Sequence, residues 1–147
     1  MIYNTIMVQL DVDGLVTPRL DFAWDLAQRF EADLIAFAAE ASPVTAGDMG
    51  GASVEATREE IYYKTTDWLR ALESEFDKFT GGSDKASWRS VIGDPTHFLA
   101  LNARAADLII VGSDSHGAGS RRQTIDPGDI VLSAGRPVLF AWTDSSR

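Results

Sequence analysis

An apolar run that breaks into a glycine-rich loop is the feature that most constrains the fold of this chain. Residues 106–111 are apolar except for Asp107, and Gly112-Ser113-Asp114-Ser115-His116-Gly117-Ala118-Gly119 follows them. Such a run is typical of a strand buried on both faces, and backbone N–H groups in a glycine loop can face a phosphate. Asp126-Pro127-Gly128 then opens a short helix, and residues 137–142 form a second buried strand. This order predicts a βαβ unit with its loop at the carboxyl end of the first strand.

The rest of the chain alternates between strands and helices in the same way. Strands are predicted at 6–11, 33–39 and 87–92, the last with the alternation of an edge strand. Helices are predicted between them. We therefore expect five strands and four helices in strict alternation, the pattern of a doubly wound α/β sheet with helices on both faces. No internal repeat or linker interrupts it, so residues 1–147 are expected to form a single domain.

Capping residues place the helix ends. Thr17 is predicted to cap a first helix that Pro18 leads, and Thr57 to open the capping box of a long second helix. Gly81-Gly82 is expected to end that second helix. Asp94 is predicted to cap a third helix. The apolar residues of the third helix that are expected to face inward are Phe98, Leu101 and Ala105.

Composition excludes several classes of protein and partner. The formal net charge of −9 repels polyanions, so nucleic acid is not expected as a partner. The absence of cysteine excludes disulfides and thiolate sites. No apolar run approaches the roughly 20 residues of a membrane helix, so no membrane partner is expected. The first residues show no basic segment of a secretory signal, and a cytoplasmic location is expected.

Four segments together resemble the universal stress protein family. They are Val8-Gln9-Leu10-Asp11, Gly93-Asp94-Pro95, residues 106–113 and Gly135-Arg136-Pro137-Val138-Leu139, and they span essentially the whole chain in the family's order. The resemblance implies a Rossmann-like fold with a five-stranded parallel sheet in the order 3-2-1-4-5. It also implies a homodimer, here expected through residues 138–142. One branch of the family binds ATP and another does not.

The resemblance carries a set of candidate ligand-binding residues. In the nucleotide-binding branch, an acid at the position of Asp11 lies against the adenosine, and backbone groups near Ala39 contact the adenine. A phosphate loop of the form Gly-x2-Gly-x9-Gly-Ser/Thr opens at the position of Gly112. The candidate residues in this sequence are Asp11, Ala39, Gly112, Ser113, Gly117, Gly119, Arg121, Arg122 and Thr124.

The phosphate loop departs from the family pattern. Ser115 stands where the second glycine belongs, and Thr124-Ile125-Asp126-Pro127 replaces the final Gly-Ser/Thr. Asp126 is predicted to cap the last helix with its own carboxylate, and Pro127 removes one N–H donor. A desolvated carboxylate there repels a phosphate by about 4 kcal/mol at a separation of about 4 Å and an effective dielectric constant of about 20. Arg121 and Arg122 could offset this repulsion by neutralising phosphates.

Simpler interpretations remain beside these. The glycines could only end a strand and permit positive φ, and Asp11 could be a turn acid. Asp11 and Asp13 could form a Mg²⁺ site. His97 and His116 lack companion ligands at metal spacing. No metal is expected. The loop serines have no nucleophile-elbow context, so no catalytic residue is predicted.

Two functional hypotheses follow, and neither is an enzyme. The first is a dimeric cytoplasmic stress-response protein that acts by interaction or weak ligand binding, with no cofactor. The alternative is a stress protein that binds ATP or another nucleotide through the loop from Gly112 to Thr124, with Arg121 and Arg122. A third class, a small nucleotide hydrolase or a flavodoxin-like electron carrier, lacks a general base and a flavin platform, and fold alone supplies neither.

Overall fold

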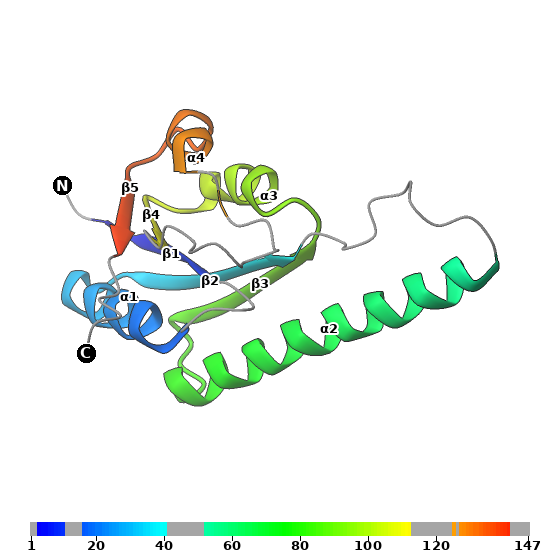
Figure 1. The fold of residues 1–147 in the computed structure, drawn as a ribbon. Helices are drawn as coiled ribbons and strands as arrows, with labels where there is room; N and C mark the ends of the chain where they lie inside the picture. The colour runs from blue at the N-terminus through cyan, green and yellow to red at the C-terminus, as the bar shows by residue number, and fades with distance from the viewer. Residues whose placement is uncertain (1–2, 11–15, 41–51, 113–124, 126, 142–147) are drawn as a thin grey trace, which may run out of the picture.

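In the computed structural model, the described residues form five parallel strands and four α-helices that alternate in sequence (Figure 1). The structure describes residues 3–10, 16–40, 52–112, 125 and 127–141. The elements are β1 (Thr5–Leu10), α1 (Val16–Phe30), β2 (Asp33–Glu40), α2 (Ala52–Thr80), β3 (Ala86–Ile92), α3 (Pro95–Asn102), a short 3₁₀ turn (Ala103–Ala105), β4 (Leu108–Gly112), α4 (Pro127–Ser133) and β5 (Val138–Ala141).

The strands form one sheet in the order β3-β2-β1-β4-β5, and every neighbouring pair is parallel. The predicted fold class and strand order are therefore confirmed. The order reverses direction between β1 and β4, because the chain moves outward from β1 through β2 to β3 and then returns to the other side of β1. In doubly wound sheets this reversal opens a crevice at the carboxyl ends of the two strands.

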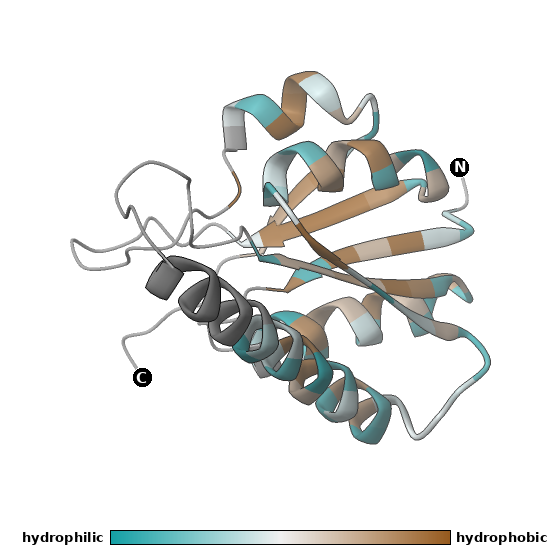
Figure 2. Cartoon of the chain, turned by 90° about the vertical axis from the view of Figure 1, so that its right-hand side faces the viewer, coloured by the Kyte–Doolittle hydropathy of each residue, from teal (hydrophilic) through white to brown (hydrophobic). Residues whose placement is uncertain are grey.

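Helices cover both faces of the sheet. Figure 1 shows α1 and α2 on one side and α3 and α4 on the other, and Figure 2 shows the strongly hydrophobic strands between these layers. Alternate residues of β1 belong to the two cores: Ile6, Val8 and Leu10 pack on the α1 side, and Met7 packs on the α3 side. Burial on both faces explains why the central strands read as continuous apolar runs.

Both long helices begin earlier than their predicted caps. Helix α1 starts at Val16 and α2 at Ala52, so Thr17 and Thr57 lie inside helices and the two N-cap predictions are wrong. The predicted end of α2 is confirmed, because Gly81 and Gly82 follow it with φ of 64° and 70°. Only glycine adopts such positive φ without steric cost.

The turn into α3 follows the prediction at its start and differs in its core face. The Asp94 carboxylate accepts a hydrogen bond from the N–H of His97 at 3.1 Å, and Pro95 occupies the first turn. Leu99 is fully buried, whereas Leu101 is 50% exposed and Ala105 is also exposed. The inward positions of Leu101 and Ala105 were therefore predicted wrongly. The helix gives way to a 3₁₀ turn after Asn102, and this changes which residues face the sheet.

Asp107 joins the amino ends of β1 and β4. Its carboxylate accepts hydrogen bonds from the N–H groups of Asn4 at 2.9 Å and Thr5 at 3.0 Å. Its own N–H donates to the carbonyl of Thr5 at 2.8 Å. This acid, which belongs to one of the segments that carry the family resemblance, thus holds the two central strands together at the end opposite the crevice.

Candidate functional site

The candidate site lies at the carboxyl edge of the sheet, where β1 and β4 separate. Of the nine predicted binding residues, the structure describes Ala39 and Gly112. Asp11 and the loop residues Ser113, Gly117, Gly119, Arg121, Arg122 and Thr124 lie outside the described residues. Asp126 and Trp142 lie outside them as well, while the predicted start of the last helix at Pro127 is confirmed.

Strand pairing ends early between β1 and β4. Their last paired residues are Val8 and Ile110, two positions before either strand ends. On the outer sides, β1 pairs with β2 as far as Leu10, and β4 pairs with β5 as far as Gly112. Each strand therefore continues for two residues past their last pair without pairing to the other, and a group from elsewhere can enter between their ends.

That group is the side chain of Arg19, from the first turn of α1. Arg19 is only 4% exposed, although it carries a full positive charge. Its Nη1 donates to the backbone carbonyl of Gln9 at 2.8 Å and to the Gln9 side-chain Oε1 at 3.0 Å. The Gln9 side chain is itself 3% exposed. Arg19 therefore donates a hydrogen bond to the β1 carbonyl of Gln9, one residue beyond the last pair that β1 forms with β4.

Gly112 lies against the same guanidinium. A Cβ added to Gly112 would lie 2.5 Å from the Arg19 Cζ and would clash with Nη2. Gly112 ends β4 but does not itself have a positive φ, so the interpretation of Gly112 as a residue that permits positive φ is wrong. Glycine is needed at 112 because the guanidinium fills the space that a side chain would occupy.

Ala39 lies near the crevice on the neighbouring strand. It follows Ala38, the last β2 residue that pairs with β1, and its own partner is Val91 of β3. Its side chain is buried in the core on the α3 side. The structure thus places Ala39, Leu10 and Gly112 near the carboxyl ends of three neighbouring strands.

Arg19 and Gln9 were missed by sequence reasoning. Both carry a signal that could have found them. Arg19 precedes the buried residues Ala23 and Ala27 at intervals of four, so helical spacing places a charged residue on the inward face of α1. Gln9 is a polar residue within an otherwise apolar buried strand. Buried polar residues require hydrogen-bond partners, and Gln9 supplies two acceptors to Arg19.

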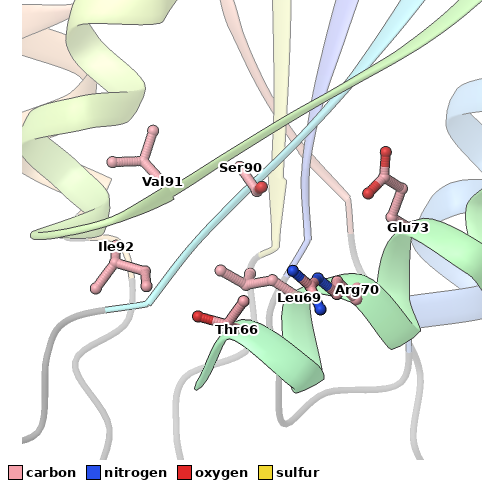
Figure 3. Close-up of a pocket in the computed structure, with 7 residues that line it drawn as sticks. All are labelled: Thr66, Leu69, Arg70, Glu73, Ser90, Val91 and Ile92. Carbon is pink, nitrogen blue, oxygen red and sulfur yellow. The ribbon is translucent and has the colours of Figure 1, made fainter. Parts of the chain in front are cut away.

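A hollow lies between α2 and the carboxyl half of β3 (Figure 3). It has a volume of about 570 Å³ and is lined by Thr66, Leu69, Arg70, Glu73, Ser90, Val91 and Ile92. Its two charged residues, Arg70 and Glu73, have opposite signs and lie three residues apart on one helix. The hollow therefore presents no excess of charge toward an ionic ligand.

The described residues contain neither a metal-binding cluster nor a membrane-spanning helix. No three histidine or acidic side chains come together among them in a way that could hold a metal ion. None of their helices is both long and apolar enough to cross a bilayer.

Comparison with known proteins rests on structure, since no family model and no curated protein matches the sequence. The universal stress protein UspA from Lactobacillus plantarum superposes with a TM-score of 0.75 at 17% identity, over 95% of this chain and 98% of that one. The chain has the universal stress protein fold. A universal stress protein in complex with cAMP gives a TM-score of 0.55 at 24% identity, over 95% and 97% of the two chains. An Arabidopsis thaliana universal stress protein family protein with AMP bound gives 0.59 at 12% identity, over 97% and 93%.

Proposed function

We propose that this chain is a cytoplasmic universal stress protein that acts without catalysis, by binding an adenine nucleotide at the crevice between β1 and β4. The observation that carries the proposal is the buried Arg19 guanidinium at the point where those strands separate. A positive charge there favours an anionic ligand on a chain whose net charge is −9. Ligands of doubly wound sheets bind at this point of the topology.

The similar solved structures support a ligand with one phosphate. One of them is a complex with cAMP, and another has AMP bound. The departures at Asp126 and Pro127 from the family's phosphate loop predict repulsion of a longer, more highly charged phosphate chain. We therefore propose a nucleoside monophosphate as the preferred ligand, with weaker binding of ATP.

Calorimetry with AMP and with ATP plus Mg²⁺ tests this function. We expect AMP to bind with a dissociation constant in the micromolar range, ATP to bind more weakly, and neither nucleotide to be hydrolysed when the mixture is analysed after the titration. Absence of AMP binding at millimolar concentration would contradict the proposal. Tighter binding of ATP than of AMP would show that Arg121 and Arg122 overcome the predicted repulsion.

A homodimer through β5 forms part of the proposal. Among the described residues, strand β5 lies at the edge of the sheet and pairs with β4 alone, and Phe140 on it is partly exposed. On the neighbouring α4, Val131 is also exposed, and Leu132 is 84% exposed. An apolar edge strand beside an apolar helix surface is stabilised when a second copy covers it.

A further inference from the structure

We infer that Arg19 binds the ligand's oxyanion, and that this oxyanion replaces the Gln9 side-chain oxygen as an acceptor of the guanidinium. The inference rests on the proposed nucleotide binding and names the residue that recognises the phosphate. None of the candidate residues derived from the sequence lies on α1. The anion would therefore be recognised by a helix that precedes the glycine loop by more than 80 residues.

Burial gives Arg19 the electrostatic strength for this role. Its side chain is 96% removed from solvent, and interactions of a charge in such surroundings are much less screened than at the surface. The two acceptors that Gln9 supplies are a peptide carbonyl and a side-chain amide oxygen, both neutral. A charged oxyanion forms shorter and stronger hydrogen bonds with a guanidinium than a neutral amide does. A phosphate oxygen in place of the Gln9 Oε1 would therefore form the stronger hydrogen bond with Arg19.

The geometry directs the guanidinium toward an entering ligand. By the alternation of β1, the Gln9 side chain belongs to the α3 face of the sheet, as Met7 does. Gly112 alternates with Ile110, which packs on the α1 face. Contact with both Gln9 and Gly112 means that the guanidinium spans the crevice between the faces. An oxyanion that enters from the carboxyl edge therefore meets Arg19 at the start of the glycine loop.

The burial of Arg19 also sets the cost of binding. Because Arg19 is covered, a ligand must displace groups that lie over it, and the Gln9 side-chain oxygen is one acceptor that it can replace while the Gln9 carbonyl keeps its hydrogen bond. Gln9 thus competes with the ligand. Removal of this competitor should strengthen binding, whereas removal of the guanidinium should weaken it.

The test compares AMP with adenosine, which lacks the phosphate, by calorimetry on the whole chain and on Arg19→Gln and Arg19→Lys. We expect Arg19→Gln to weaken AMP binding by roughly 10- to 100-fold and to leave adenosine binding unchanged, because only the charge-assisted hydrogen bonds are lost. Arg19→Lys keeps the positive charge but lacks the planar guanidinium with its several N–H donors, and it should give an intermediate loss of AMP affinity. Equal AMP affinity in the original chain and in Arg19→Gln would overturn the inference, and so would a parallel loss for AMP and adenosine.

A second variant keeps the inference testable if Arg19→Gln does not fold. Gln9→Met removes the competing amide and retains the guanidinium and the backbone acceptor. We expect it to raise AMP affinity by about 3- to 10-fold, and unchanged or weaker AMP binding would overturn the inference. If the original chain binds neither AMP nor adenosine, the proposed function itself fails. If it binds both equally, the proposed function stands and the assignment of Arg19 fails.

Discussion

The guanidinium of Arg19 fills the space into which a side chain at position 112 would project. A Cβ added to Gly112 would lie 2.5 Å from the Cζ of Arg19. Arg19 on α1 and Gly112 at the end of β4 are 93 residues apart in the sequence, yet their shapes are complementary in the fold. The match explains the glycine at 112 without reference to a ligand, and it also places a cation where the glycine loop starts.

Gly112→Ala should therefore destabilise the chain by about 1–3 kcal/mol, because the added methyl group forces the buried guanidinium to move. In an Arg19→Ala background the same substitution should cost less than about 1 kcal/mol, since the space is then empty. Urea unfolding of the four chains measures both values. An equal loss in the two backgrounds would mean that Arg19 is not the neighbour that restricts position 112.

Asp107→Ala should lower stability by about 1–3 kcal/mol, because the N–H groups of Asn4 and Thr5 lose their common acceptor. Asp67→Ala, an exposed acid on α2, serves as a control and should change stability by less than about 0.5 kcal/mol. Thermal and urea unfolding give both numbers. Similar effects at the two positions would contradict the role assigned to Asp107 in joining β1 to β4.

Gly93→Ala tests the turn between β3 and α3. A Cβ at this position would lie 2.7 Å from Cδ2 of Phe98 and closer still to its ring edge. The ring must shift away from the core beside α3, at an expected cost of about 1–3 kcal/mol. In Phe98→Leu, whose side chain is smaller, Gly93→Ala should cost clearly less. A loss that is the same with either residue at 98 would point to the backbone of the turn instead.

The proposed dimer predicts a mass of twice the 16.0 kDa chain in light scattering at tens of micromolar protein. Phe140→Lys places a charge on the edge strand and should produce the monomer, because the charge must be desolvated in a strand-to-strand interface. Phe22→Lys, at an exposed position on α1, is the matched control and should leave the dimer intact. A monomeric original chain, or a dimer that persists in Phe140→Lys, would refute the β5 interface.

Asp126→Ser tests the predicted repulsion of long phosphate chains. Serine and aspartate are similar N-caps, so stability should change by no more than about 1 kcal/mol. ATP affinity should rise, and Arg121→Ala in the Asp126→Ser background should then reduce the gain. Calorimetry with ATP and Mg²⁺ measures both effects. A loss of several kcal/mol in stability without any gain in affinity would show that Asp126 belongs to a buried network instead.

The order of elements could be predicted from the sequence because its signals are local. Runs such as 106–111 are apolar in consecutive residues, and Gly81-Gly82 ends a helix by backbone conformation alone. The Asp94 cap also depends on a hydrogen bond between neighbours in sequence. The starts of α1 and α2 were misplaced because a capping residue also fits inside a helix when the turn before it remains helical.

The sequence by itself determined the alternation of strands and helices, the carboxyl edge as the place of the candidate site, and glycine at its entrance. Only the tertiary structure decided which side chains meet at that edge. Arg19, Gln9 and Gly112 lie on three different elements, and no spacing along the chain relates them. Their association depends on the early end of the pairing between β1 and β4, beyond which the Arg19 side chain reaches Gln9 from α1. A buried charge is stable only where such packing brings its acceptors together, so its position could be known only from the folded chain.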